Sequence, residues 1–453
     1  MKINAKIAVV FCIALTLFSL AITFLFGNPR VSYDGWQYLS SAKSIQDGTF
    51  AENYFWVRQP GYPLFIDFSF SIYDSFWTLI VLQVSLFALA FNFLIWQVRS
   101  YFPRLPNRIF LLSSSLTFAF LTLFLGGYNL AVLPQSITSS FLMILTGVTL
   151  NIYRMNSLEE VSQFSKIVFL FALPLLVVIG FSISPILSYL VLTTEVFLIF
   201  NLFYLSPRNK GFLKIERVLP AKNLLLAILG LSLLSLVFVD FTWTNFSQKF
   251  IAGTSFNLNQ LKDPFWGIGL QDYLSNLKRD PQLLHYIPAS FFALLMLIPN
   301  TGWNGLVIEK PSSSHSQNAD VGFGLFSTNY GSCVDFPGEV LAVDNEYIRR
   351  FGLTESCSLT NFDLPQFFFF PLLLIWAFLC IYWLYRIVIL RDPLFLVLST
   401  VSITYLLTYS LLGGGIDRYG SSVYPIIAII VTLRLSSNWL DSAGKDTHQR
   451  LNR

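Results

Sequence analysis

Charged residues are scarce in this sequence. They make up 12% of its 453 residues, which is about half their usual share in soluble proteins. Hydrophobic residues reach 54%, and phenylalanine alone occurs 46 times. This composition excludes an ordinary soluble domain and indicates a polytopic membrane protein. The net charge of +4 comes from short basic loops, and it does not indicate nucleic-acid binding.

Potential metal ligands are also few and scattered. The three histidines, His285, His315 and His448, lie too far apart for a zinc site. There is no Asp-x-Asp pair, although a divalent cation on a diphosphate donor needs two or more neighbouring carboxylates. The glycines at 413–415 are better explained by a sharp turn than by a phosphate-binding loop. The sequence therefore predicts no metal and no cofactor, and it disfavours a soluble nucleotide-sugar donor.

Long apolar runs recur along the chain. A helix of about twenty apolar residues crosses the roughly 30 Å of hydrocarbon in a bilayer. The sequence thus predicts an all-α polytopic membrane protein with about ten transmembrane helices. The expected positions are 5–26, 75–98, 109–125, 136–153, 167–181, 186–203, 223–240, 367–390, 394–413 and 423–438.

Basic residues gather on one side of this topology. Because cytoplasmic loops retain Lys and Arg, we expect both termini to be cytoplasmic, in a bacterial inner membrane or a plasma membrane. The exception is Arg418, the single basic residue in the short outward loops 126–135 and 412–422. The residues on the basic side are Lys2, Lys6, Arg99, Arg104, Arg108, Arg154, Lys166, Arg208, Lys210, Lys214, Arg217, Lys222, Arg386, Arg391, Lys445, Arg450 and Arg453.

This topology divides the chain into three segments. Residues 1–240 form an N-terminal transmembrane module whose first outer loop, 27–74, we expect to lie on the membrane surface as amphipathic helices. Residues 241–366 form a long outer loop, and residues 367–453 form the last three helices and a cytoplasmic tail. The apolar stretch 286–299 within the long loop is only about fourteen residues long, which is typical of an interfacial or re-entrant segment.

The four cysteines fall into two pairs. Cys333 and Cys357 both lie in the long outer loop, where an oxidising compartment would allow them to form a disulfide. Cys12 and Cys380 lie inside predicted spans, where we expect small, inert apolar residues.

The first outer loop begins with an acid followed by a helical pattern. Asp34 precedes Trp36, Leu39, Ala42 and Ile45, which recur every three residues. This spacing predicts a helix on the membrane surface. Asp34 has two interpretations: it caps the helix by accepting backbone N–H groups, or it is a carboxylate oriented for catalysis. The two roles are compatible, because a carboxylate at a helix start is held in one orientation.

A rigid basic element follows in the same loop. In Arg58-Gln59-Pro60-Gly61-Tyr62-Pro63, Pro60 favours an extended Gln59 and can open a helix. Arg58 is therefore presented at a fixed place. Its guanidinium suits bidentate recognition of a phosphate, and the alternative is a surface arginine paired with lipid headgroups.

Together these elements resemble the GT-C superfamily of integral-membrane glycosyltransferases, particularly its protein-mannosyltransferase and aminoarabinose-transferase-like branch. The resemblance lies in the outward Asp34, in Tyr38 four residues later, and in the Arg58-to-Pro63 element. A late Asp417-Arg418-Tyr419, six residues before Pro425, is similar to an Arg-Tyr signature before a late span. The chain departs from the family where it has Asp34-Gly35 for Asp-Glu, and Pro134-Gln135 for a Glu at the start of the fourth span.

The resemblance implies transfer of a sugar from a polyprenyl-phosphate donor to a lipid, glycan or protein acceptor at the extracytoplasmic face. Asp34 would be the general base and Arg58 and Arg418 would bind the donor phosphate. The residues expected to position substrate are Tyr38, Tyr62, Tyr419, Gln135 and Asp240. Aromatic residues near an interface also serve as membrane anchors, and Asp240 also fits a simple boundary residue.

Two other functions remain open. A transporter or flippase for lipid-linked saccharides should have ionisable residues spread through several spans, whereas the charges here concentrate in outer loops. A polymerase or ligase of lipid-linked glycans would use the outer arginines but would not need Asp34. The requirement for Asp34 therefore discriminates between these functions.

Overall fold

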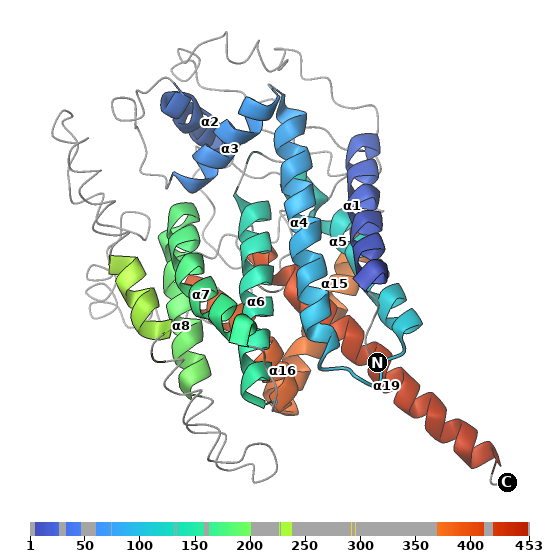
Figure 1. Ribbon diagram of the computed structural model, residues 1–453. Coiled ribbons are helices and arrows are strands. Elements are labelled where there is room, and N and C mark those ends of the chain that lie inside the picture. The colour runs from blue at the N-terminus through green and yellow to red at the C-terminus, as the bar shows by residue number, and fades with distance from the viewer. Residues whose placement is uncertain are drawn as a thin grey trace, which may run out of the picture.

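The computed structural model describes residues 5–26, 33–46, 60–73, 75–130, 132, 134–157, 163–200, 226, 228–237, 291, 295, 369–411 and 420–451. Within these ranges every regular element is a helix, and the helices pack into a bundle (Figure 1). The elements are α1 (Ala5–Phe26), α2 (Tyr33–Gln46), α3 (Gly61–Ile72), α4 (Phe76–Arg99), α5 (Asn107–Leu130), α6 (Gln135–Ser157), α7 (Gln163–Ile183), α8 (Pro185–Phe200), α15 (Phe369–Leu384), the π-helix η5 (Tyr385–Ile389), α16 (Pro393–Leu398), α17 (Thr400–Leu411), the 3-10 helix η6 (Ser421–Val423) and α19 (Tyr424–Leu451).

Five of these helices are long and apolar enough to cross a membrane, which supports the assignment to membrane proteins. They are Lys6–Leu25, Phe76–Arg99, Asn107–Leu125, Gln135–Tyr153 and Ser421–Leu440. Other predicted spans coincide with shorter apolar helices, namely Phe171–Ile183, Leu187–Val196, Ile228–Val237 and Leu374–Ile389. The total of ten spans therefore stays a prediction.

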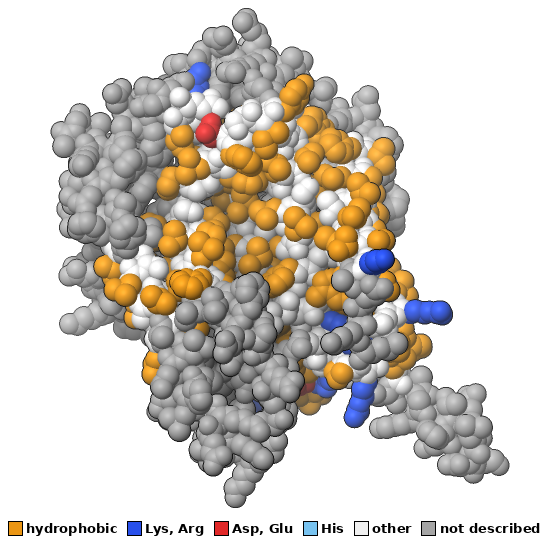
Figure 2. Space-filling model, in the orientation of Figure 1, with side chains coloured by type: hydrophobic (Ala, Val, Ile, Leu, Met, Phe, Trp, Pro, Cys, Tyr) orange, Lys and Arg blue, Asp and Glu red, His pale blue; other side chains and the backbone are white. Residues whose placement is uncertain are grey.

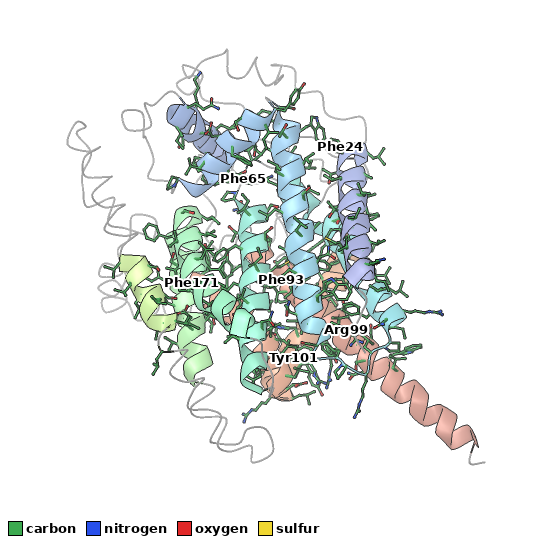
Figure 3. The ribbon with its side chains drawn as sticks, viewed as in Figure 1. Phe24, Phe65, Phe93, Arg99, Tyr101 and Phe171 are labelled. Atoms are coloured by element: carbon green, nitrogen blue, oxygen red, sulfur yellow. The ribbon has the colours of Figure 1, made fainter. Side chains whose placement is uncertain are left out.

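The first two long helices run antiparallel. Phe11 near the start of α1 contacts Trp96 near the end of α4, with ring centroids 6.3 Å apart. Phe24 near the end of α1 stacks on Trp77 near the start of α4 at 4.7 Å. These two contacts define opposite ends of the bundle. Figure 3 accordingly places Phe24 and Arg99 at opposite ends.

Apart from Lys43 on α2, the basic residues whose side chains the structure describes gather at the end that contains Arg99. Phe110 at the start of α5 lies under the Arg99 guanidinium at 5.4 Å, and Tyr101 donates a hydrogen bond to the carbonyl of Leu150 near the end of α6. We call this the basic end. Its residues are Lys6, Arg99, Arg104, Arg108, Arg386, Arg391 and Arg434. Figure 2 shows Lys and Arg side chains grouped below the apolar surface on the same side of the bundle as the C-terminus.

An aromatic core joins the early helices to the late ones. Trp376 of α15 stacks on Tyr424 of α19 at 4.0 Å, and Phe124 of α5 lies 5.9 Å from the Trp376 ring. Trp376 Nε1 also donates to the carbonyl of Leu295 at 3.1 Å. Leu295 belongs to the predicted interfacial segment, and it is fully buried where it contacts α15.

Large apolar side chains also cover the outside of the bundle. Along α1, for example, Val10, Leu17 and Leu25 are between 60% and 71% exposed. Figure 2 shows such side chains spread across the face of the bundle. An apolar surface of this extent fits a lipid environment, because a soluble monomer rarely exposes one.

The two short helices of the first predicted loop pack together at the end opposite the basic one (Figure 1). Leu39 and Ala42 of α2, two residues of the predicted helical pattern, are buried in the protein, and they share an apolar cluster with Ile66 of α3. α3 begins directly after Pro60, and the Leu64 N–H donates to the Pro60 carbonyl at 2.8 Å. The prediction that Pro60 opens a helix is thereby confirmed.

Candidate functional site

Two of the predicted substrate-positioning residues, both from the first predicted loop, are in contact with each other. Tyr38 of α2 and Tyr62 of α3 meet edge to face, with ring centroids 4.9 Å apart. Both side chains are buried, Tyr62 completely. Phe65 of α3, whose ring centroid lies 6.4 Å from that of Tyr62, is labelled in Figure 3 at the same end of the bundle as Phe24. The contact fixes α2, which carries Asp34, against α3, which follows Arg58.

A chain of hydrogen bonds continues from Tyr62 into the bundle. The Tyr62 hydroxyl donates to Gln83 Oε1 of α4 at 2.8 Å, and Gln83 Nε2 donates to the Asn129 carbonyl of α5 at 3.0 Å. Ser136 of α6 donates to Asn129 Oδ1 at 2.7 Å. All four side chains are buried. We call these four residues the amide network, and the end of the bundle that holds them the network end.

The amide network joins four helices through neutral groups. In an apolar interior such hydrogen bonds fix side-chain positions, because each unpaired polar group would lose its interaction with water without replacement. The hydrogen bond from Tyr62 to Gln83 therefore holds both side chains in fixed orientations.

Gln135, another predicted site residue, adjoins this network as the first residue of α6. Its side chain is 4% exposed, and its Oε1 has no hydrogen-bond partner among the described residues. Buried polar atoms of this kind are rare in folded proteins and call for a ligand, a water or a functional role. Gln135 Oε1 is thus a candidate acceptor for a hydrogen bond from a ligand or a water molecule.

A glycine sets how closely α3 approaches α7. A Cβ placed on Gly61 would lie 2.5 Å from the Ser182 carbonyl oxygen near the end of α7. That oxygen belongs to the backbone and cannot rotate away. Gly61 is therefore required for the close packing that seats Tyr62 beside Gln83.

The charged residues of the predicted site fall only partly within the described residues. Asp34 is the second residue of α2, so it lies within the first turn, two positions after the capping position. A carboxylate there still interacts favourably with the helix dipole. Its side chain lies outside the described residues, as do Arg58, Arg418, Tyr419, Asp240, Cys333 and Cys357.

The structure describes the chain again two residues after each of these arginines. Pro60, two residues after Arg58, begins α3. Gly420, two residues after Arg418, is buried, and the adjoining η6 packs against α6. Tyr424 lies 6.2 Å from Phe124 near the end of α5. The predicted early and late motifs therefore adjoin helices of the same bundle.

Sequence reasoning overlooked Gln83 and Asn129. Gln83 was read as part of an apolar span, and Asn129 as part of a short outward connection. The available signal was the amide side chain itself, because a polar residue within or beside a span usually hydrogen-bonds to another helix.

A fully buried carboxylate lies elsewhere in the bundle. Glu195 of α8 has no exposed surface, and its Oε1 accepts a hydrogen bond from Ser232 Oγ at 2.6 Å. Its Oε2 has no partner among the described residues. An acid at this depth in a membrane protein is a functional candidate, and here it also links α8 to the helix Ile228–Val237.

Comparisons with protein-family models, with characterised proteins and with solved structures found no match. Within the described residues no group of three or more His, Cys, Asp or Glu side chains could hold a metal ion. The function is therefore argued from the residues of this chain.

Proposed function

We propose that this protein is a membrane glycosyltransferase of the GT-C type. It would move a sugar from a polyprenyl-phosphate donor to a hydroxyl of a lipid, glycan or protein at the extracytoplasmic face. One observation supports this proposal most strongly: the Tyr62–Gln83 hydrogen bond at 2.8 Å. This hydrogen bond connects α3, which follows Arg58 in the chain, to α4. Helix α3 also packs against α2, which contains Asp34.

The proposed chemistry is an inverting displacement at the anomeric carbon. Asp34 takes the proton of the acceptor hydroxyl as its oxygen bonds to that carbon from the face opposite the phosphate. The bond from carbon to phosphate oxygen breaks, and the electron pair leaves with the lipid phosphate. Arg58 and Arg418 stabilise the negative charge that develops there. Tyr38, Tyr62, Tyr419, Gln135 and Asp240 position the sugar and the acceptor.

Replacement of Asp34 by Asn tests this proposal. Loss of the base should lower transfer of labelled sugar from polyprenyl-phosphate donors by roughly 10²–10⁴-fold, with the yield of folded protein unchanged. Asp67→Asn on α3 is the matched control, since Asp67 is a half-buried acid of the same loop with no predicted role. Equal transfer by wild type and Asp34→Asn would remove Asp34 from catalysis. If variants that lack Arg58 and Arg418 lose transfer while Asp34→Asn retains it, the polymerase or ligase function would be favoured.

Transport of a lipid-linked saccharide is the second candidate, and Glu195 is the observation in its favour. A buried carboxylate with one unpartnered oxygen suits a transport pathway through the spans. The discriminating experiment uses protein reconstituted in vesicles with a fluorescent lipid-linked saccharide. Movement between leaflets that is lost in Glu195→Gln and kept in Asp34→Asn would establish transport in place of transfer.

A further inference from the structure

Three side chains converge where α15, α16 and α19 meet at the basic end. Asp392 precedes α16, and its Oδ1 accepts the Leu394 N–H at 3.0 Å, so this oxygen caps the helix. The other oxygen, Oδ2, accepts a hydrogen bond from Arg386 and lies 3.6 Å from a terminal nitrogen of Arg434. Two guanidinium groups therefore share one carboxylate oxygen.

This arrangement leaves hydrogen-bond donors without acceptors. A guanidinium has five N–H donors. Arg434 donates no hydrogen bond to any described residue, and the Nε atoms of both Arg386 and Arg434 are shielded from solvent without a partner. Donors of charged groups are costly to leave unsatisfied when they are buried. Arg434 therefore has terminal N–H groups that can donate to an acceptor with several oxygen atoms.

The arginines are also held in place and partly desolvated. The side chains of Arg386 and Arg434 are 13% and 27% exposed, and Arg386 Cζ lies 5.3 Å from the centre of the Phe395 ring. The π-helix η5 contains Arg386, and π-helical turns are frequent at functional sites. Positive charges that are fixed in this way bind anions better than mobile surface lysines do.

The residue that joins η5 to Asp392 adds a third positive charge. Arg391 is exposed and has φ 46°, a conformation that glycine adopts far more easily than arginine. Together Arg386, Arg391 and Arg434 oppose the single carboxylate of Asp392. The described residues around this junction thus carry an excess of two positive charges.

Exposed apolar side chains border the arginines. Val388 and Ile389 of η5 are 60% and 66% exposed. Fixed cations beside an exposed apolar surface match a phospholipid, which has a phosphate next to acyl chains.

We propose that Arg386, Arg391 and Arg434 form a binding site for a phosphate group, carried by an anionic phospholipid or free in solution. The site lies at the opposite end of the bundle from the amide network and is independent of the proposed sugar transfer. The phosphate oxygens accept hydrogen bonds from the terminal N–H groups of the guanidiniums, as phosphates do from arginine forks. Bound phosphate would thereby strengthen the junction of α15, α16 and α19.

The test measures thermal unfolding of the purified full-length protein in a neutral detergent. Phosphatidylglycerol, phosphatidylcholine and inorganic phosphate are titrated separately, with sodium chloride as the control for ionic strength. We expect phosphatidylglycerol to raise the unfolding temperature by roughly 2–4 °C. In Arg434→Gln the phosphatidylglycerol concentration that gives half of this shift should rise about tenfold, as expected for the loss of charge-assisted hydrogen bonds.

Two further variants keep the test decisive. Arg391→Gly removes a charge where glycine suits the backbone, so it folds even if Arg434→Gln does not, and it too should weaken the response. Arg104→Gln and Arg108→Gln remove exposed arginines of the same end and should respond as wild type does.

The outcomes separate the two sources of phosphate. A response to phosphatidylglycerol alone supports a lipid headgroup, and a response to inorganic phosphate as well supports recognition of the phosphate group itself. No response beyond that to phosphatidylcholine and sodium chloride would overturn the proposal. The same conclusion would follow if Arg391→Gly and the folded Arg434→Gln both responded as wild type does.

Discussion

The two ends of the bundle are built from different chemistry. At the network end, neutral groups of Tyr62, Gln83, Asn129 and Ser136 hydrogen-bond to one another between helices. At the basic end, Arg99 donates instead to backbone carbonyls, including that of Leu105 at 2.6 Å. The basic end is thus held by charged groups at the ends of helices, whereas the amides lie inside the bundle.

This difference suggests how the network end would work. A neutral, fully paired scaffold holds positions without adding charge, so the charges of a reaction have to come from residues set on it. The sequence offers Asp34, Arg58 and Arg418 for that purpose, and each adjoins an element that packs at this end. The electrostatic effect of such charges is largest where the surroundings are preorganised and dry.

The largest effect on stability is expected for Gly61→Ala. The new methyl group would lie 2.5 Å from the Ser182 carbonyl oxygen, so α3 has to shift. Overpacking of this kind typically costs about 1–3 kcal/mol of unfolding free energy. The control is Gly230→Ala, where no atom lies within 4 Å of the new Cβ and a helix should gain up to about 1 kcal/mol. Thermal unfolding in detergent measures both, and equal stability of the two variants would contradict the close approach.

Arg58→Lys and Arg418→Lys should weaken donor use. Lysine keeps the positive charge but loses the planar fork that holds a phosphate with two hydrogen bonds. We expect kcat/KM for the polyprenyl-phosphate donor to fall by an amount equivalent to roughly 1–3 kcal/mol of transition-state stabilisation. Arg104→Lys at the basic end serves as the control. Unchanged dependence on donor concentration in both variants would remove these arginines from the proposed site.

Tyr62→Phe should destabilise the network end by about 1–2 kcal/mol. It removes a buried hydrogen bond, since Gln83 Oε1 accepts the Tyr62 hydroxyl at 2.8 Å. Tyr73→Phe is the control, because Tyr73 ends the same helical segment and is 71% exposed. Tyr62→Phe combined with Gln83→Leu should cost less than the sum of the single changes. Strict additivity would show that the two side chains are not coupled.

Gln135→Leu is expected to have the smallest effect on stability and a selective effect on activity. Its Oε1 has no partner among the described residues, so an apolar side chain of similar size should change the unfolding free energy by less than about 0.5 kcal/mol. Transfer activity should fall if substrate supplies the missing donor. A variant with full activity would show that Gln135 only packs at the start of α6.

Much of the fold could be predicted from composition and periodicity. The expected spans 5–26, 75–98 and 136–153 agree with α1, α4 and α6 to within a few residues. Helix α2 was predicted from Leu39 and Ala42 in a three-residue pattern, and both side chains are buried. Boundaries were less predictable: α5 runs to Leu130, beyond the predicted end at residue 125, because Gly126 and Gly127 do not interrupt the helix.

The site could be predicted only in part. Tyr38, Tyr62 and Gln135 were identified from the sequence, and the structure brings the two tyrosines into contact. Gln83 and Asn129 were not identified, because a single amide in an apolar segment does not reveal which helix its side chain meets. Gly61 was visible in the sequence, but its close approach to Ser182 depends on how α3 packs on α7.

The sequence by itself determined that this is a helical membrane protein, because apolar segments in a bilayer have to satisfy their own backbone hydrogen bonds. It also determined where α2 and α3 form, through the spacing of apolar residues and the position of Pro60. Only the tertiary structure decided that Tyr62 would meet Gln83, 21 positions away, and that Gln83 would reach the Asn129 carbonyl, 46 positions further on. Contacts at such separations depend on helix packing and crossing geometry, which no local pattern of residues specifies.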